Sequence, residues 1–171
     1  LIRRADANDL EALHLLGIRY SEGDGVIQDK QLGFRMVKKA ADQGYVPAEA
    51  SLGYLYEKGR GVNVDRKKAV ELYTRAAEKG DATAQNNLGA MYYNGTFVRQ
   101  NYRKAFQWIK KAAEQNHTVA QRNLGRMYEN GQGIHKNPKE AIKWYTLAAE
   151  KGDEESIKAL QRLDIGPKNT Y

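Results

Sequence analysis

Four of the five Leu-Gly dipeptides along this chain recur at a constant spacing of 36 residues. The copies lie at 16–17, 52–53, 88–89 and 124–125. A period of about 20 to 50 residues is typical of solenoids and other repeat arrays. Each glycine also falls within an apolar pattern typical of a helix, where glycine costs about 1 kcal/mol relative to alanine. Its recurrence therefore predicts a structural requirement shared by all four copies.

Other positions repeat with the same period and without an insertion. They comprise an alanine, a tyrosine, a turn glycine and an Ala-Ala pair in each copy. The members are Ala12, Ala48, Ala84 and Ala120; Tyr20, Tyr56, Tyr92 and Tyr128; Gly23, Gly59, Gly95 and Gly131; and the pairs at 40–41, 76–77, 112–113 and 148–149. So many positions in register predict a tandem array in which each copy is one structural unit.

Each copy is predicted to form two helices. In the first copy, Ala12, Leu16 and Tyr20 are four residues apart, which places them on one face of a helix A over about residues 10–22. Helix B is expected to begin after a residue suited to an N-cap and to end at one that tolerates a left-handed backbone. These residues are Asp29, Asp65, Asn101 and Asn137 at the start, and Gly44, Gly80, Asn116 and Gly152 at the end. No segment alternates with period two, so the predicted fold class is all-α, an α-solenoid of antiparallel helix pairs.

The predicted domain organisation is a single repeat domain over residues 1–171. It comprises the end of a preceding helix B (1–8), four full repeats (9–44, 45–80, 81–116 and 117–152), and a capping helix with a tail (153–171) that Gly166-Pro167 is expected to stop. Because Ala5 is in register with Ala41, the chain is expected to begin inside a helix B. We therefore expect a longer parent chain on the N-terminal side of Leu1.

Two positions in the third repeat raise particular questions. Gly89 is expected to let a neighbouring helix pack closely against its backbone. Phe97 stands where the other repeats have Gly25, Gly61 and Gly133. A bulky residue disfavours positive φ. Either this turn never requires positive φ, or the third loop follows a different path.

The repeat resembles the Sel-one-like repeat (SLR) family, whose helical repeats are related to the tetratricopeptide repeat. The segments "AEASLGYLYEKGRGVNVDRKKAVELYTRAAEKG" (48–80) and "AQRNLGRMYENGQGIHKNPKEAIKWYTLAAEKG" (120–152) carry the resemblance. It implies a right-handed superhelix with helix A on the concave side and helix B on the convex side. It also implies a non-catalytic adaptor or scaffold. The branch of this family with one disulfide per repeat is not matched, because the chain has no cysteine.

The sequence offers no constellation typical of catalysis, and no cofactor is expected. The three histidines, His14, His117 and His135, occupy different positions of the repeat and so do not form one metal site. The G-x-G turns follow helices rather than strands, which indicates structural turns and not nucleotide loops. The prediction is that the chain is not an enzyme.

The partner-binding face can be predicted from helix geometry at 100° per residue. Positions 12, 13, 16, 17, 19 and 20 fall on the packed side of helix A, and positions 11, 14, 15, 18 and 22 fall on the other side. The second set varies between repeats, as recognition positions do. The predicted partner-binding residues are His14, Ile18, Tyr54, Asn86, Asn87, Arg122, Asn123 and Arg126.

These positions predict the chemistry of the partner. The two asparagines at positions 87 and 123 suit the backbone of a peptide, since an amide both donates and accepts. Arg122 and Arg126 are four residues apart and are expected to grip one carboxylate together. The expected partner is another protein that offers an extended or helical segment with an acidic group.

The net charge of +7 leaves an alternative open, a basic module for acidic lipid or another polyanion. Most basic residues lie on helix B or its lead-in, where acidic residues such as Glu71, Glu78 and Glu150 accompany them. A nucleic-acid binder concentrates positive charge along one tract with exposed aromatic rings. We therefore expect no nucleic acid as partner, and only indirect membrane contact.

Overall fold

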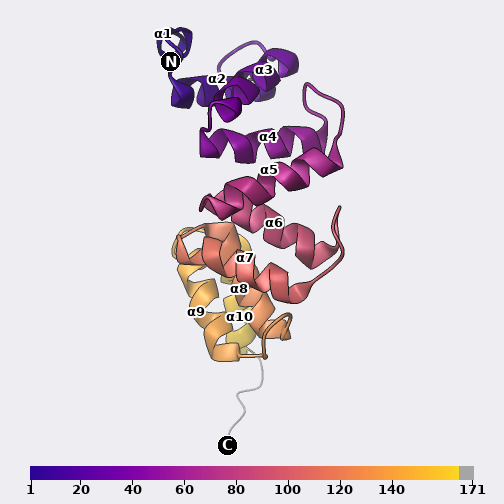
Figure 1. The fold of residues 1–171 in the computed structure, drawn as a ribbon. Coiled ribbons are helices and arrows are strands. Elements are labelled where there is room, and N and C mark those ends of the chain that lie inside the picture. The colour runs from indigo at the N-terminus through magenta and orange to yellow at the C-terminus, as the bar shows by residue number, and fades with distance from the viewer. Residues whose placement is uncertain (166–171) are drawn as a thin grey trace, which may run out of the picture. The chain divides into compact units, whose positions relative to one another are not determined.

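The computed structural model describes residues 1–165, and these residues form helices and no β-strand (Figure 1). The prediction of an all-α fold of helix pairs is confirmed. The helices are α1 (Ile2–Asp6), α2 (Leu10–Glu22), α3 (Lys30–Asp42), α4 (Val46–Lys58), α5 (Arg66–Glu78), α6 (Ala82–Asn94), α7 (Tyr102–Glu114), α8 (Thr118–Asn130), α9 (Pro138–Ala149) and α10 (Glu154–Ile165).

The helices repeat with the period of the sequence. The A helices α2, α4, α6 and α8 begin at residues 10, 46, 82 and 118, and the B helices α3, α5, α7 and α9 begin at residues 30, 66, 102 and 138. Each successive start is 36 residues further along. Gly166 and Pro167, which were expected to stop the last helix, lie outside the described residues.

The predicted ends of the B helices are confirmed in atomic detail. The side chain of Asp29 accepts a hydrogen bond from the backbone N–H of Leu32, at 2.8 Å, and Asp65, Asn101 and Asn137 cap their helices in the same way. After each B helix one residue has positive φ. These residues are Gly44, Gly80, Asn116 and Gly152. Local sequence thus sets the limits of every B helix before tertiary packing contributes.

The chain divides into two compact units, Leu1–Ala84 (unit 1) and Gln85–Tyr171 (unit 2), with the boundary inside α6. In unit 1, α2 packs on α3, α3 on α4, and α4 on α5. In unit 2, α7 packs on α8, α8 on α9, and α9 on α10. Each unit is therefore a short stack in which a helix contacts its sequence neighbours, as in a repeat array.

Small residues let paired helices approach closely. The repeated alanines of the A helices, such as Ala12 and Ala120, have no exposed surface. Gly89 faces α7 so closely that a Cβ on it would lie 2.5 Å from Cγ1 of Ile109. A Cβ on Gly125 would lie 2.8 Å from the ring of Tyr145. The expectation that Gly89 serves close helix packing is confirmed, because any side chain there would displace its partner helix.

The aromatic positions of the repeat are less deeply buried than the small ones. Tyr56 is buried and lies edge-on against Phe34, with ring centroids 5.5 Å apart. Tyr128 is half-buried and lies against Phe106 in the same way, at 5.4 Å. The chain's two tryptophans, Trp108 and Trp144, occupy equivalent positions in α7 and α9. Aromatic pairs thus join a B helix to the A helix that follows it.

Polar contacts inside the helix pairs alternate between repeats. In the second repeat the hydroxyl of Tyr73 donates to Glu57 at 3.0 Å, and in the fourth the hydroxyl of Tyr145 donates to Glu129 at 2.8 Å. The first and third repeats have Val37 and Ile109 at the position of these tyrosines. The side-chain chemistry therefore has a longer period of two repeats superimposed on that of the backbone.

The backbone conformation at Phe97 differs from both expectations, that the turn never requires positive φ and that the third loop follows a different path. Its φ is +64°, close to the values of Gly25 (+69°), Gly61 (+72°) and Gly133 (+78°). The third loop therefore keeps the backbone conformation of the others and places a bulky residue in the left-handed region. That region costs an L residue about 1–2 kcal/mol relative to glycine.

We predict that Phe97→Gly is more stable than Phe97→Ala by about 1 kcal/mol. Both variants lose the contacts of the phenyl ring, and only the alanine keeps a Cβ at positive φ. The measurement is chemical denaturation followed by circular dichroism.

The neighbouring Thr96 provides the control for Phe97, because it does not have positive φ. There the alanine variant should be the more stable one, since glycine loses more backbone freedom on folding. An alanine at position 97 that is as stable as glycine would contradict the strain at this turn.

Ser156 in α10 is the one departure from alanine at its position in the repeat, which Ala12, Ala48, Ala84 and Ala120 occupy in the A helices. It is fully buried, and its hydroxyl has no hydrogen-bond partner among the described residues. Because an unsatisfied buried hydroxyl destabilises the folded state, we predict that Ser156→Ala raises the free energy of unfolding by about 1 kcal/mol.

Ser51→Ala is the matched control for Ser156→Ala. The hydroxyl of Ser51 lies 2.8 Å from Nε2 of His14, so its removal should lower stability. The denaturation midpoints of the two variants are expected to move in opposite directions. A lower midpoint for Ser156→Ala would show that its hydroxyl is satisfied.

Candidate partner-binding surface

The face predicted to bind a partner comprises positions 11, 14, 15, 18 and 22 of each helix A. We call it the A-helix face. In unit 1 it lies on α2 and α4, and in unit 2 it lies on α8 and the part of α6 that follows Ala84.

In unit 1, His14 is tied to the next repeat. Its Nε2 lies 2.8 Å from the hydroxyl of Ser51, and its ring lies 5.6 Å from the ring of Tyr45. Leu15 is 44% exposed beside it, and Ile18 is half-buried. This part of the face therefore presents aliphatic side chains next to a fixed imidazole.

Tyr54 lies at the other end of the same face, among charged groups. The guanidinium of Arg60 lies 5.4 Å from the centre of the Tyr54 ring, and the ammonium of Lys58 lies at 6.0 Å. Arg60 also approaches Glu22, at 3.6 Å. The half-buried Tyr54 ring thus has cations on its surface, an arrangement favoured by the negative face of the ring.

In unit 2, three of the predicted residues are linked by hydrogen bonds. Nδ2 of Asn123 donates to Oδ1 of Asn86 at 3.1 Å, and Nη2 of Arg126 donates to Oδ1 of Asn123 at 3.3 Å. The Asn86–Asn123 pair joins the same two repeat positions as the His14–Ser51 pair, each 37 residues apart. Position 14 of one repeat therefore bonds position 15 of the next. Asn87 is half-buried beside Asn86.

Asn86 is less accessible than its place on the predicted face implied. It is only 7% exposed, because the following repeat covers it, and its amide oxygen is used by Asn123. Asn86 thus orients Asn123 rather than offering its own amide outward.

Arg122 is also engaged within the chain. Its Nη1 lies 2.7 Å from Oδ2 of Asp153, and its Nε lies 3.4 Å from Oε2 of Glu155. Asp153 also caps α10 by accepting from the N–H of Ser156 at 2.9 Å. The expected joint grip of Arg122 and Arg126 on one carboxylate therefore needs correction, because two carboxylates of the chain already neutralise Arg122.

Arg126 remains exposed on the A-helix face. Its guanidinium lies 5.2 Å from the centre of the Tyr93 ring. Tyr93 in turn lies 5.2 Å from the ring of Tyr102, and its hydroxyl donates to Gln132 at 2.7 Å. The predicted arginine is thus held by an aromatic neighbour that leaves it accessible to a partner.

Two residues that shape this surface were not predicted, Tyr93 and Asp153. Tyr93 stands where the second and fourth repeats have Glu57 and Glu129, so its difference from the other repeats was the available signal. Asp153 occupies the position directly before an A helix, where Asp9 and Asp81 cap α2 and α6. The aspartate caps of α2, α6 and α10 can be found from the sequence in the same way as those of the B helices, whereas Tyr45 before α4 forms no such cap.

Other kinds of site find little support. Among residues 1–165 no group of three His, Cys, Asp or Glu side chains is placed to hold a metal ion. In the same part of the chain, no helix combines the length and the apolar character that a membrane crossing requires.

A comparison with protein-family models matches the Sel1 repeat at residues 10–45, 46–81, 82–117 and 118–153. The chain belongs to the Sel1 repeat family. The matched repeats begin one residue later than the predicted ones. Members of this family commonly mediate protein interactions and are typically non-catalytic. A comparison with curated proteins found no match.

Solved structures agree with this assignment. A Sel1 repeat protein from Oxalobacter formigenes is 33% identical with a TM-score of 0.84, and the match covers 91% of this chain and 64% of that one. The protective antigen c5321 of uropathogenic Escherichia coli, which displays an SLR fold, is 37% identical with a TM-score of 0.81, over 92% of this chain and 34% of that one. The chain thus spans less than two thirds of either relative.

A third solved structure is the cysteine rich protein B (hcpB) of Helicobacter pylori. It is 28% identical with a TM-score of 0.60, over 74% of this chain and 96% of that one. Since the present chain contains no cysteine, its repeats keep the helix-pair architecture without any disulfide.

We predict that the stability of unit 1 falls as the pH falls below about 6.5, through His14. Burial lowers the pKa of His14, although the charge of Asp81 acts in the opposite direction. Below the ordinary pKa the unfolded chain gains a proton that the folded chain resists, so acid favours unfolding. Denaturation midpoints at about pH 7.5 and about pH 5.5 measure the effect.

The His14→Gln variant should lose part of this pH dependence, because glutamine keeps a polar group near Ser51 without titrating. His135→Gln, on an exposed loop, is the control and should keep the dependence of the unmodified chain. Equal pH dependence in the chain and in His14→Gln would exclude the histidine as its source.

Proposed function

We propose that this chain is a protein-interaction scaffold that binds an extended or helical segment of a partner along its A-helix face. The observation that carries the proposal is the contrast between the two sides of helix A. On the packed side, the residue types of Ala12, Leu16, Gly17 and Tyr20 recur in all four copies, whereas positions 13 and 19 vary. The A-helix face carries a different set of residues in every repeat, and Leu15 and Arg126 on it are exposed.

The chemistry of the face supports a peptide-like partner. Leu15, Ile18 and Tyr54 offer apolar surface in unit 1. In unit 2, Asn123 is held by Asn86, so its amide is oriented before any partner arrives. A pre-oriented amide suits the main chain of a bound segment, because it both donates and accepts.

Arg126 is the residue proposed to select an acidic group on the partner. It is exposed, and Tyr93 and Asn123 limit its side-chain freedom. Arg122 contributes to this selection indirectly, by neutralising Asp153 and Glu155 near the same face. A guanidinium that is already ordered loses less entropy when it binds a carboxylate.

The proposal predicts that Arg126→Glu removes partners that a matched variant retains. Lys39→Glu on α3 makes the same change in net charge on an exposed part of a B helix. Proteins captured from source lysate are compared by quantitative mass spectrometry. The segment of a captured partner that binds is then identified with synthetic peptides. The affinity of that peptide is measured for the unmodified chain and for each variant. We expect at least about a tenfold loss of affinity for Arg126→Glu and little change for Lys39→Glu.

Tyr54→Ala tests the same face in unit 1, and circular dichroism verifies that each variant keeps its helices. If Arg126→Glu and Tyr54→Ala both bind the same partners as the unmodified chain with equal affinity, the A-helix face is not the binding surface.

A further inference from the structure

Most of the excess positive charge of the chain lies in the third and fourth repeats. Between Asp81 and Glu114 the sequence contains no acidic residue. The same stretch contains five basic residues. They are Arg99, Arg103, Lys104, Lys110 and Lys111. The first repeat (9–44), by contrast, has six acidic and five basic side chains. The net charge of +7 is thus a local property and not an even surplus.

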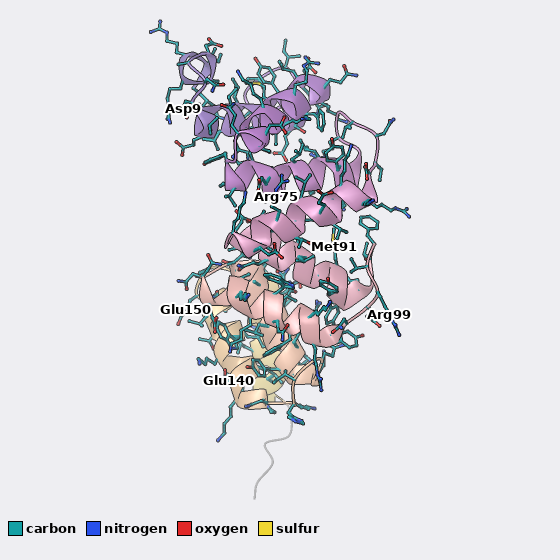
Figure 2. All side chains as sticks on the ribbon, in the orientation of Figure 1. Asp9, Arg75, Met91, Arg99, Glu140 and Glu150 are labelled. Carbon is teal, nitrogen blue, oxygen red and sulfur yellow. The ribbon has the colours of Figure 1, made fainter. Side chains whose placement is uncertain are left out.

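Three of the five basic residues meet at the start of α7 without a counter-charge. Arg99 lies on the loop before the helix and projects outward from it (Figure 2), and Arg103 and Lys104 lie in the first turn. All three are exposed, and none forms a salt bridge with another residue of the described part of the chain. Lys110 at the other end of α7 lies 3.7 Å from Glu114.

The helix itself adds positive potential at this point. The first turn of a helix favours acidic side chains, because its free N–H groups carry partial positive charge. In α7 that turn contains no acidic residue, and the cap is the neutral Asn101, where α3 and α5 have Asp29 and Asp65. The first turns of α3 and α5 also lack acidic residues, but their caps are carboxylates, whereas no carboxylate at the cap offsets the cations of α7.

The surface around these cations is hollowed. One hollow of about 560 Å³ is lined by Tyr92, Val98, Arg99, Gln100, Asn101 and Lys104. A second, of about 420 Å³, is lined by Arg103, Gly131, Gly133, Ile134 and His135. The neighbouring residues Arg103 and Lys104 thus face different hollows.

The loop before α9 closes on this end of α7 and adds more charge. Gly133 approaches so closely that a Cβ on it would lie 2.1 Å from the carbonyl oxygen of Tyr102. Lys136 on the same loop and Lys139 in the first turn of α9 are both exposed. Basic residues of the fourth repeat thus lie on, and just after, the loop that packs against this end of α7.

We propose that this basic patch, formed by Arg99, Arg103, Lys104, Lys136 and Lys139, binds an extended acidic segment of a partner protein. Side-chain carboxylates or phosphates of the segment occupy the two hollows, where guanidinium and ammonium groups pair with them. The patch is a second surface, separate from the A-helix face. Its neutral cap keeps the local potential positive, and long-range attraction increases the rate at which acidic partners arrive.

The local chemistry favours a protein segment over a membrane or a nucleic acid. Val98 and Ile134 are only half-buried rather than protruding, so the patch presents no apolar tip for insertion into lipid. The ring of Tyr92 already has the ammonium of Lys104 at 5.2 Å, and Trp108 has that of Lys111 at 4.5 Å. Cations cover these two rings, and the exposed ring of Tyr102 lies edge-on against Tyr93 with centroids 5.2 Å apart. The rings therefore do not form a row of free faces on which successive bases can stack.

The test uses fluorescence anisotropy with the full chain and three labelled peptides of equal length. One is rich in glutamate, one carries phosphoserine, and one has glutamine in place of every glutamate. We expect the two anionic peptides to bind, and their affinity to fall between about 50 mM and about 200 mM salt. The glutamine peptide should not bind. The two anionic peptides distinguish carboxylate from phosphate as the preferred group.

Two variants with equal loss of charge locate the site. Arg99→Gln/Arg103→Gln/Lys104→Gln should lower the affinity for the anionic peptides by about tenfold or more. Arg35→Gln/Lys38→Gln/Lys39→Gln on α3 should lower it by less than about twofold. Equal losses in both variants would overturn the proposal, because they would indicate a diffuse charge effect.

Asn101→Asp provides a test in which a loss of binding cannot be attributed to unfolding of the variant. Aspartate is as good an N-cap as asparagine, so the fold should be at least as stable. The added carboxylate should weaken binding of the anionic peptides, and unchanged binding would overturn the proposal. A larger loss of affinity for the anionic peptides in Arg126→Glu than in the triple variant would assign their binding to the A-helix face and overturn the proposal. The proposal would also be overturned if anionic vesicles or a DNA oligonucleotide bound through the same three residues more tightly than the anionic peptides do.

Discussion

The close approach of helices A and B depends on the absence of a side chain at one position of the repeat. Gly17, Gly53, Gly89 and Gly125 occupy it, and a Cβ on Gly89 or Gly125 would lie less than 3 Å from atoms of the facing helix. Real carbon atoms do not approach so closely. The glycine lowers the intrinsic helix propensity by about 1 kcal/mol, and packing between the paired helices offsets that loss. The buried alanine positions, the short connections and the constant period all follow from this contact.

Helix pairs, their limits and their period could be predicted from the sequence because each depends on local signals that recur. The caps at Asp29 and Asn101 show this, since one residue type at one position determines where a helix begins. Phe97 could not be predicted correctly. Sequence preference indicates that a bulky residue avoids positive φ, but the surrounding repeat holds the loop in the conformation that the glycines take.

The A-helix face was defined from helix geometry, but the pairings among its residues were not predicted. Helix geometry identified the face, and it placed Asn123 and Arg126 where both are accessible or half-buried. It could not indicate that Asn86 is covered by the next repeat, or that Asp153 and Glu155 would occupy Arg122. Such contacts join residues about one repeat apart, so they depend on how successive repeats stack. Whether the face binds a partner stays a prediction.

Both tryptophans, Trp108 and Trp144, lie in the B helices of unit 2, and the aromatic residues of unit 1 are tyrosine and phenylalanine. Tryptophan emission is therefore a local probe that responds to the third and fourth repeats alone. Far-ultraviolet circular dichroism, in contrast, reports every helix of the chain. A single titration observed by both methods can thus resolve whether the two units melt as one cooperative body or in succession, with no added label.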